Sequence, residues 1–269
     1  MYPRNAEYNG TTWWANGSFP LQKIRFKDWE EKGEKTILEQ LVIDYSTNAL
    51  HGQTDMRSVE TVQAGALEII KPIVHGGRAY IVVKRCFDIV FALIGGIIFL
   101  LQMLIIALLI RIDSPGPAIF KQERLGIQGK PFLIYKFRSM QLDAEREGPQ
   151  WAVQNDSRCT RVGRFLRKSR LDELPQFWNI LKGDMSFVGP RPERACFYEA
   201  FERYIHGFKN RLLVKPGLTG LAQVNGGYDL KPEEKILYDI DYICSRTFAL
   251  DMKCIFKTLC LVFTHEGAR

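Results

Sequence analysis

One stretch of the chain limits the possible folds more than any other. From Ile89 to Ile110 the sequence reads IVFALIGGIIFLLQMLIIALLI and contains no charged residue. As a helix with a rise of 1.5 Å per residue, this stretch is about 33 Å long, which suits the hydrocarbon core of a bilayer. A buried helix of a soluble core fits less well, because soluble helices seldom lack a polar face over such a length. The stretch therefore predicts a membrane-inserted helix.

The charges that flank this stretch bear on how it enters the membrane. Residues 69–88 contain Lys71, Arg78, Lys84 and Arg85, and residues 111–130 contain Arg111, Lys121, Arg124 and Lys130. A spanning helix usually has an excess of cations on its cytoplasmic side, so this symmetry favours a re-entrant helix with both ends at one face. A single-pass anchor is the alternative. Because a bend needs a weak point, we expect it at Gly95-Gly96 or at Gln102.

The apolar stretch also divides the chain. Residues 1–80 form an N-terminal extension to which the sequence assigns no chemistry, residues 81–112 form the membrane helix region, and residues 113–269 follow as one further domain. In that domain the strand-like segments 118–120 and 132–135 predict a small β-hairpin. Helical patterns follow up to Asn179, over 192–211 and over 233–263. The fold class is therefore α+β, mostly helical.

The helical pattern over 233–263 carries a broad apolar stripe. Such a stripe fits amphipathic helices that lie in the membrane interface. Helices packed on a soluble core fit equally well.

The composition narrows the class of partner. A formal net charge of +7 suits an anionic partner such as phosphate, nucleic acid or an acidic membrane surface. The six cysteines include no CxxC pair and lie at no short spacing to the four histidines, so zinc is not expected. A reduced, cytoplasmic setting is the natural interpretation of these thiols. The first ten residues also lack the basic cap and apolar run of a cleaved secretory signal.

The strongest candidate for chemistry is the acidic pair Asp172 and Glu173. Pro175 is tolerated only in the first turn of a helix, so we expect a helix to begin near Leu171 or Asp172. This places both carboxylates at the positive end of a helix dipole, a position that also suits phosphate. One carboxylate can act there as a nucleophile or metal ligand and the other as a proton acceptor. An ordinary helix cap would have the same composition.

Basic residues surround the acidic pair in the sequence. The cations that precede it are Lys136, Arg138, Arg158, Arg161, Arg164, Arg167, Lys168 and Arg170. Such a concentration suits a polyphosphate substrate, although a basic face on an anionic membrane has the same appearance. Downstream, the Pro-Arg-Pro loop, residues 189–192, holds Arg191 between Pro190 and Pro192. The prolines restrict the backbone and thereby fix the guanidinium for bidentate phosphate binding, or they form a plain rigid turn.

Five motifs occur in a recognisable order. They are KRCFD at 84–88, DSPGPAIFKQERLG at 113–126, YKFRSM at 135–140, LDELPQFWNILKGDMSFVGPRP at 171–192 and VKPGLTGLAQV at 214–224. On these motifs the chain resembles the bacterial sugar transferases of the monotopic phosphoglycosyl transferase superfamily. These enzymes begin polysaccharide and glycoconjugate assembly on undecaprenyl phosphate. The resemblance runs from about Lys84 to Phe263 and leaves residues 1–80 outside it.

The resemblance implies a two-step reaction, with residues 113–269 as the catalytic domain. Asp172 would attack the β-phosphate of a UDP-sugar, release UMP and hold the sugar phosphate as an acyl phosphate. Glu173 would assist deprotonation of the incoming polyprenyl phosphate. Mg²⁺ fits this chemistry, with Asp172 as its protein contact. The predicted phosphate- and nucleotide-binding residues are Lys136, Arg138, Arg158, Arg170, Pro190, Arg191 and Pro192.

The resemblance also implies a setting and a set of partners. The site would face the cytoplasm at the bacterial inner membrane, and its partners would be a UDP-sugar, polyprenyl phosphate and membrane lipid, with downstream glycosyltransferases or a second copy as further candidates. Nucleic acid is not expected as a partner, because the sequence combines its positive net charge with neither a helix-turn-helix pattern nor a zinc-binding pattern. A non-enzymatic membrane scaffold would leave the acidic pair and the Pro-Arg-Pro loop unexplained. The identity of the sugar does not follow from the sequence.

One position departs from the family pattern. Members with a re-entrant helix usually break the apolar run with a Ser-Pro pair near its middle, where this chain has Leu100-Leu101. Any bend must therefore arise without proline.

Overall fold

The computed structural model describes residues 25–27, 40–42, 67–146, 156–226 and 230–264. The chain divides into two compact units. The minor unit comprises Met1–Pro72 and Glu199–Asn210, and the main unit comprises Ile73–Tyr198 and Arg211–Arg269. In the minor unit, β1 (Arg25–Lys27) pairs antiparallel with β2 (Gln40–Val42), and β3 (Leu67–Glu68) pairs parallel with β7 (Ile205–His206).

The helix expected over 192–211 is shorter than predicted. The helix α5 covers only Ala195–Glu202, and the chain then forms β7 and the 3₁₀ helix η3 (Phe208–Leu213). The Glu202 carboxylate accepts hydrogen bonds from the backbone N–H groups of Gly207 and Lys209, at 2.9 and 2.8 Å. Gly207 has a φ of 91°, a left-handed conformation that is easy only for glycine. This turn explains why the helical pattern does not continue.

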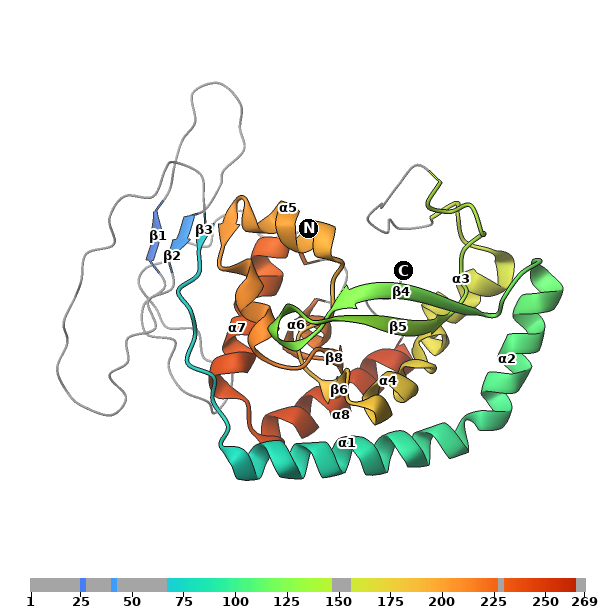
Figure 1. Ribbon diagram of the computed structural model, residues 1–269, viewed down its shortest axis with the longest axis horizontal. Helices are drawn as coiled ribbons and strands as arrows, with labels where there is room; N and C mark the ends of the chain where they lie inside the picture. Colours follow the sequence, from blue (N-terminus) through green and yellow to red (C-terminus); the bar gives the residue numbers. More distant parts are fainter. Residues whose placement is uncertain (1–24, 28–39, 43–66, 147–155, 227–229, 265–269) are drawn as a thin grey trace, which may run out of the picture. The chain divides into compact units, whose positions relative to one another are not determined.

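The apolar stretch forms two helices, α1 (Arg78–Ile98) and α2 (Leu100–Asp113), which meet at Phe99 with a bend of 60° (Figure 1). The prediction of a bend at Gly95-Gly96 or Gln102 was wrong, because the break lies between these positions. Helical bonding continues through it, since the Phe99 N–H donates to Gly95 O at 2.9 Å. Gly95 instead permits close packing, because a Cβ there would lie 2.9 Å from the Phe177 ring.

The two helices expose most of their apolar side chains. On α1, Val82, Phe91, Leu93, Ile94, Ile97 and Ile98 are each at least 48% exposed, and on α2 the same holds for Leu100, Leu101, Leu104, Ile105, Leu108 and Ile112. Among the described residues, no single helix is both long and apolar enough to cross a bilayer. The bent pair α1 and α2 meets that requirement only when both helices are counted together.

The predicted hairpin is present and longer than expected. Strands β4 (Ile119–Leu125) and β5 (Pro131–Phe137) pair antiparallel, with Phe120 opposite Lys136. The turn between them contains the short 3₁₀ helix η1 (Ile127–Gly129). Because side chains alternate between the two faces of a strand, Phe120 and Lys136 share one face, while Lys121 and Tyr135 share the other.

The acidic pair and the Pro-Arg-Pro loop lie on the elements after the hairpin. These are α3 (Arg161–Lys168), the 3₁₀ helix η2 (Leu171–Glu173), α4 (Gln176–Lys182) and β6 (Ser186–Val188), which pairs parallel with β8 (Gly217–Thr219). The close approach of Gly189 and Gly217 leaves no room for side chains, because a Cβ on Gly217 would lie 2.1 Å from the Gly189 nitrogen.

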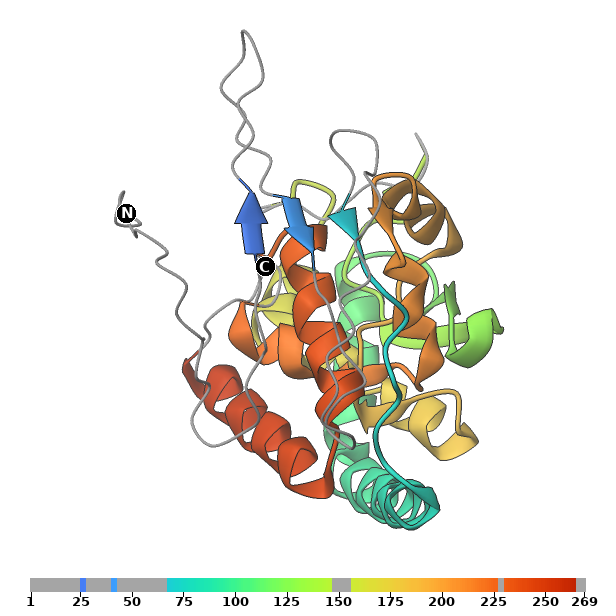
Figure 2. The ribbon, with the colours of Figure 1, turned by 90° about the vertical axis from the view of Figure 1, so that its left-hand side faces the viewer.

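The chain ends in three helices, α6 (Leu221–Asn225), α7 (Pro232–Ser245) and α8 (Phe248–Thr264). The apolar stripe predicted over 233–263 is divided between α7 and α8, and the two helices differ in burial. Helix α7 buries Ile236, Ile240 and Ile243 completely and so belongs to the core, whereas α8, which leaves α7 at a sharp corner (Figure 2), exposes Phe256 and Leu259.

Polar contacts fix α1 to the rest of the main unit. The Lys84 Nζ lies 2.8 Å from Asp251 Oδ2, and the buried Asp88 accepts hydrogen bonds from Ser186 Oγ and the Phe187 N–H, both at 3.0 Å. Arg85 donates to the carbonyls of Ile180 and Leu181 at the end of α4, at 2.6 and 2.8 Å. We refer to the contacts of Lys84, Arg85, Asp88 and Asp251 as the α1 anchor. The KRCFD motif therefore joins the apolar helix to the polar body.

The other end of the bent pair is fixed to the same unit. Asp113 Oδ2 at the end of α2 accepts a hydrogen bond from the Val162 N–H at 3.1 Å. Arg138 on the chain after β5 donates to the carbonyls of Ser114 and Pro115, both at 2.7 Å. Both ends of the α1–α2 pair are thus hydrogen-bonded to one compact unit.

Candidate active site

A cavity of about 460 Å³ lies beneath one face of the hairpin, within the range usual for small-molecule sites. Its lining combines side chains from β4, β5, α3, the Pro-Arg-Pro loop, α5, α6 and α7 with Asp172 of the acidic pair. Cations dominate the charged part of this lining, which includes Arg124, Lys136, Arg138, Arg158, Arg167, Arg170, Arg191, Arg194 and Lys235 against Glu145, Asp172 and Glu193. The charged part of the lining is therefore mainly cationic. Below, the cavity is called the pocket.

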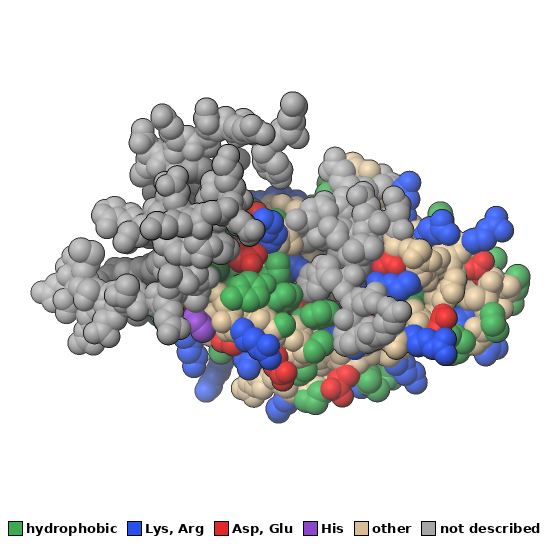
Figure 3. Space-filling model, turned by 90° about the horizontal axis from the view of Figure 1, so that it is seen from above, with side chains coloured by type: hydrophobic (Ala, Val, Ile, Leu, Met, Phe, Trp, Pro, Cys, Tyr) green, Lys and Arg blue, Asp and Glu red, His purple; other side chains and the backbone are tan. Residues whose placement is uncertain are grey.

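The exposed surface differs from one side of the molecule to the other. Figure 3 views the side opposite α1, and the described part of this face mixes Lys, Arg, Asp and Glu side chains with hydrophobic ones. The exposed side chains of α1 and α2 from Val90 to Leu109 are, by contrast, apolar.

The acidic pair is held on a 3₁₀ turn rather than in an α-helix. The expectation that a helix begins near Leu171 or Asp172 holds only for η2, because the α-helix α4 begins at Gln176 with Pro175 as its N-cap residue. Proline has no N–H to donate, so the α-helical bonding pattern starts after it. The turn is entered through Arg170, whose φ of 57° is left-handed. This unfavourable conformation redirects the chain from α3 toward the pocket.

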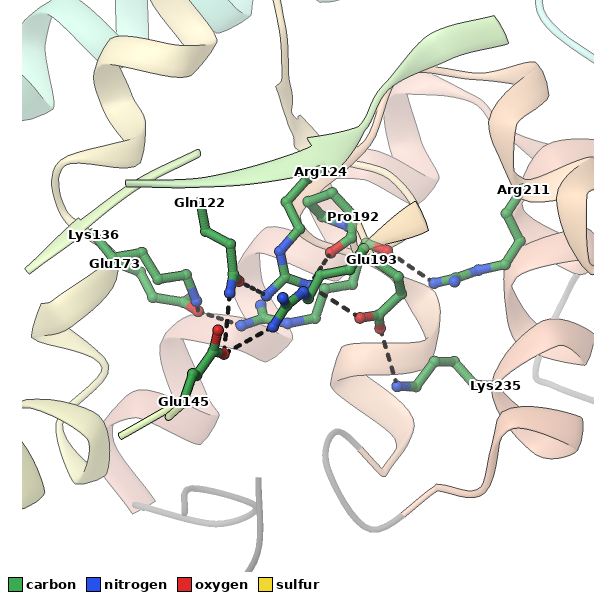
Figure 4. A network of polar contacts seen from close by, with 11 residues as sticks. Gln122, Arg124, Lys136, Glu145, Glu173, Pro192, Glu193, Arg211 and Lys235 are labelled. Carbon is green, nitrogen blue, oxygen red and sulfur yellow. Dashed lines mark hydrogen bonds and ion pairs between the residues drawn. The ribbon is translucent and has the colours of Figure 1, made fainter. Parts of the chain in front are cut away.

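The two carboxylates of the pair have opposite surroundings. Glu173 Oε1 accepts from Lys136 Nζ at 3.0 Å and from Arg191 Nη2, and Figure 4 shows Lys136 and Glu173 facing each other. The Asp172 side chain is only 8% exposed, and within the described residues its carboxylate has no hydrogen-bond or ion-pair partner. One carboxylate is thus neutralised by cations, and its neighbour is left available.

The pKa values of the pair diverge for the same reason. Burial raises the pKa of Asp172 to about 6, a shift that Lys136 only partly offsets. Burial would also raise the pKa of Glu173, but Arg191 and Lys136 outweigh it and lower that pKa well below its usual range. The two cations therefore hold Glu173 as an anion, while Asp172 has the higher pKa of the two.

The hairpin is kept in place by an amide beside the pair. Asn179 on α4 accepts from the Tyr135 N–H at 3.0 Å and donates to Leu133 O at 2.7 Å. This side chain pairs with β5 as a neighbouring strand would. It fixes the distance between Lys136 on β5 and Glu173 just before α4.

The predicted basic residues have different surroundings. Lys136, Arg138, Arg158, Arg170 and Arg191 all line the pocket with Asp172. Arg138 is 4% exposed and uses both Nη groups on the Ser114–Pro115 turn. Arg158 forms a bidentate pair with Asp156, at 2.8 and 2.6 Å, which lowers the pKa of Asp156 to about 2. Pro190 and Pro192 are buried behind Arg191 and are not part of the pocket lining.

Several residues of the site were missed by the sequence analysis. Arg124 donates to Pro192 O at 3.2 Å and to Glu193 Oε2 at 3.3 Å, and Glu193 also faces Lys235 Nζ at 3.6 Å (Figure 4). Arg124, Glu193 and Lys235 all line the pocket. Glu193 directly follows the Pro-Arg-Pro loop, and this adjacency was the available signal. Nothing in the local sequence pattern indicates Lys235, which lies on α7.

The donor groups of the pocket limit how a metal could bind. Among the residues that the structure describes, no cluster of three or more His, Cys, Asp or Glu side chains could hold a metal by itself. Mg²⁺ is commonly held by one or two carboxylates together with substrate phosphates and water. The carboxylate of Asp172, which has no partner in the described part of the chain, fits that requirement, whereas Glu173 is bound by two cations.

A pocket with a mainly cationic charged lining that includes Asp172 and an exposed apolar helix pair occur together in one unit of the fold. The family model "Bacterial sugar transferase" matches residues 79–265. The chain belongs to the bacterial sugar transferase family.

Named relatives agree with this assignment. The chain is 46% identical over 193 residues to the UDP-N-acetylgalactosamine-undecaprenyl-phosphate N-acetylgalactosaminephosphotransferase of Aeromonas hydrophila, a match that covers 71% of this chain and 46% of the relative. It is 42% identical over 190 residues to the UDP-glucose:undecaprenyl-phosphate glucose-1-phosphate transferase of Escherichia coli (strain K12), covering 69% and 41%. It is 36% identical over 231 residues to the undecaprenyl-phosphate galactose phosphotransferase of Salmonella typhimurium, covering 80% and 47%. The matches thus span less than half the length of these relatives.

Proposed function

We propose that this chain transfers a sugar 1-phosphate from a UDP-sugar to undecaprenyl phosphate, releasing UMP and forming a polyprenyl diphosphosugar. The product would begin the assembly of an exopolysaccharide, capsule, O-antigen or glycoprotein glycan. The observation that carries the proposal is the buried carboxylate of Asp172, which has no hydrogen-bond or ion-pair partner among the described residues, in a pocket lined with cations. The names of the relatives support the same reaction class.

In the first step a carboxylate oxygen of Asp172 attacks the β-phosphorus of the UDP-sugar. The bond between this phosphorus and the oxygen bridging it to the α-phosphorus breaks, UMP leaves, and the sugar phosphate stays on Asp172 as an acyl phosphate. Lys136 and Arg191 lie beside the carboxylate pair, where they stabilise the charge that develops on the phosphate oxygens. Burial leaves Asp172 poorly solvated, which raises its reactivity.

In the second step a phosphate oxygen of polyprenyl phosphate attacks the same phosphorus and frees the Asp172 carboxylate. Glu173 would accept any proton that the incoming phosphate still carries. With Lys136 and Arg191 both bound to it, Glu173 is a weak base. When these cations are shared with the bound phosphates, the pKa of Glu173 rises and the side chain becomes able to accept a proton.

Mg²⁺, held by Asp172 and the phosphates, would neutralise charge on the diphosphate and so favour departure of UMP. The hairpin, the Asn179 amide and the Pro-Arg-Pro loop would position the catalytic side chains relative to the bound phosphates.

We assign the protein to the bacterial inner membrane with its active site facing the cytoplasm and with α1 and α2 as a re-entrant pair. The contiguous exposed apolar surface of these helices requires an apolar environment. A straight span would carry its two ends to opposite faces of the membrane. Here the start of α1 is bonded through Lys84 and the end of α2 through Asp113, both to the main unit.

Cysteine labelling tests this topology. Single cysteines at Gly77 and Pro117, in a chain whose exposed Cys86, Cys196 and Cys260 are serine, should both resist an impermeant maleimide added to intact spheroplasts. Both should react after permeabilisation. Labelling of only one of them from outside would establish a spanning helix.

UMP release tests the reaction. Purified protein with Mg²⁺ and undecaprenyl phosphate is offered UDP-N-acetylgalactosamine, UDP-glucose and UDP-galactose, with heat-inactivated protein as control. One donor should give sustained UMP release. Without undecaprenyl phosphate the same donor should give a burst of about one UMP per protein, with the mass of a sugar phosphate added to a peptide containing Asp172. Absence of UMP from every donor contradicts the proposed activity, and absence of the burst contradicts the covalent step.

A further inference from the structure

Each backbone carbonyl from residue 190 to residue 193, that is, within the Pro-Arg-Pro loop and at the residue after it, accepts a hydrogen bond. The donors come from separate parts of the chain: the Gly217 N–H to Pro190 O at 2.9 Å, Arg211 Nη2 to Arg191 O at 2.9 Å, Arg124 Nη1 to Pro192 O at 3.2 Å, and the Leu125 N–H to Glu193 O at 3.1 Å. Two of these donors are backbone N–H groups, one at the start of β8 and one at the end of β4. The other two are guanidinium groups, a costly choice for a purely structural bond, because the charges must be compensated.

Arg211 is the most deeply buried of these donors. Its side chain is 0% exposed, its Nε donates to Asp239 Oδ2 at 2.7 Å, and its guanidinium lies over the Tyr198 ring at 5.7 Å. Figure 4 shows Arg211 approaching the loop from the side opposite Lys136 and Glu173. Arg124 lines the pocket, but neither Arg211 nor Asp239 belongs to the lining. Arg211 and Asp239 therefore reach a substrate in the pocket only through other residues.

We propose that Arg211, oriented by Asp239, is a positioning residue that holds Arg191 in place for the reaction. The inference rests on the proposed function, in which the guanidinium of Arg191 serves the diphosphate. Arg211 donates a hydrogen bond to the backbone carbonyl of Arg191, and the side chain of Arg191 donates one to Glu173. Because rigid prolines flank Arg191 on both sides, a hydrogen bond to its carbonyl also fixes the position of its Cα, from which the side chain extends.

The chemistry of the ion pair between Arg211 and Asp239 explains why arginine is needed at residue 211. A guanidinium presents its donors in one rigid plane, so Nε can bond Asp239 while Nη2 bonds the loop. A lysine is shorter and carries its donors on one nitrogen, and it cannot reach both partners in this geometry. A buried ion pair adds little net stability compared with apolar packing, so stability alone is a weak reason for its presence.

A double-mutant cycle on UMP release separates positioning from general stability. Arg211→Lys should lower kcat/KM for the UDP-sugar about 10- to 100-fold, the scale expected when a catalytic group is displaced by about 1 Å. In an Arg191→Ala background the same change should cost less than about 3-fold, because the group it positions is gone. Circular dichroism and thermal unfolding check that each variant is folded. Equal losses in both backgrounds would assign Arg211 to stability alone and overturn the proposal.

Hydrogen exchange provides a readout that needs no substrate and no activity. In the ligand-free protein, Arg211→Lys should speed exchange of the Gly217 and Leu125 amides, because both donate to the loop. Exchange in α8 serves as the internal reference. Unchanged exchange at both amides in folded protein would also overturn the proposal. If the unmodified chain releases no UMP, the proposed function fails on its own, and the exchange measurement still decides whether Arg211 holds the loop.

A second variant covers the case in which Arg211→Lys does not fold. Asp239→Asn keeps the shape of the partner but weakens its hold on Arg211, so it should cause the same changes to a smaller degree, a loss of several-fold in kcat/KM. Normal kcat/KM together with normal loop exchange in folded Asp239→Asn would remove Asp239 from the inferred arrangement and leave Arg211 without the orienting partner on which the proposal depends.

Discussion

The α1 anchor and the pocket both bury carboxylates, but they treat them differently. In the anchor, Asp251 accepts hydrogen bonds from Lys84, Tyr80 and Tyr242 at 2.8 to 2.9 Å, and Asp88 accepts from Ser186 and Phe187. Beside the pocket, Glu173 is equally well partnered by Lys136 and Arg191, which line it. Asp172, its direct neighbour in the sequence, has no such partner within the described residues.

This difference separates structural from reactive carboxylates. A buried carboxylate with donors around it stabilises the arrangement of the elements that supply them. A buried carboxylate without donors is costly to fold and has a raised pKa. A fold retains such a group only where it serves another purpose. Changes in the anchor should therefore affect stability, and changes at Asp172 should affect chemistry.

The largest expected effect is on chemistry, from Asp172→Asn. Loss of the nucleophile should reduce UMP release by at least about 1,000-fold, while the melting temperature in detergent stays the same or rises, because a buried charge without partners is removed. Glu193→Gln is a useful comparison, since it alters a partnered carboxylate of the same pocket and should lower stability. A fall in stability of Asp172→Asn would contradict the comparison, and near-normal turnover would remove Asp172 as the nucleophile.

The opposite pattern is expected from Asp251→Asn in the anchor. An amide can accept fewer hydrogen bonds and leaves Lys84 buried without its counter-charge, so the free energy of unfolding should fall by about 3 to 5 kcal/mol. UMP release per folded molecule should remain within about 3-fold of normal, because the pocket keeps all its residues. Chemical denaturation followed by circular dichroism measures the first quantity. A large loss of turnover in folded protein would show that the anchor acts on the site.

The pH dependence of stability should distinguish the two regions next. Because the pKa of Asp172 is raised from 3.8 to about 6 in the folded state, the folded protein binds a proton more tightly than the unfolded chain does. Ionisation of Asp172 therefore lowers the free energy of unfolding progressively as the pH rises from about 4 to 6, and this contribution is constant at higher pH. The stability of Asp172→Asn relative to the unmodified protein should therefore increase over this window, by on the order of 2 to 3 kcal/mol.

Thermal unfolding without Mg²⁺ or nucleotide at pH 4, 5, 6 and 7 measures this difference. The Asp251→Asn variant provides the control, because it keeps Asp172 and should therefore keep the part of the pH dependence that Asp172 contributes. A difference between Asp172→Asn and the unmodified protein that is constant from pH 4 to 7 would show that Asp172 is solvated or partnered.

The sequence predicted those features that depend on neighbouring residues. The hairpin and the rigid loop around Arg191 follow from strand and turn residues a few positions apart. The approach of Arg211 and Asp239 depends on tertiary packing between segments 28 positions apart, and no local pattern encodes it. The same holds for Lys235 beside Glu193.

Two positions show what the fold adds to the sequence. Arg138 was expected to bind phosphate, which stays a prediction; it lines the pocket, and its Nη groups also hold the turn that ends α2. The bend of the apolar stretch was expected at glycine or glutamine, yet it lies at Phe99. Gly95 serves instead to admit the Phe177 ring of α4. Composition indicates that a residue is special, but the partner that decides its role is supplied by the fold.

The smallest effect should come from Arg85→Lys, which refines the comparison within the anchor itself. Arg85 donates to the carbonyls of Ile180 and Leu181, at the end of the helix that follows the acidic pair. Lysine keeps the favourable charge at a helix C-terminus but loses one of the two planar donors, so the free energy of unfolding should fall by about 1 kcal/mol. UMP release should be unchanged, because α4 is also held by Asn179. If Arg85→Lys instead lowers turnover without lowering stability, α1 controls the position of the acidic pair through α4, and the anchor and the pocket are one functional region rather than two.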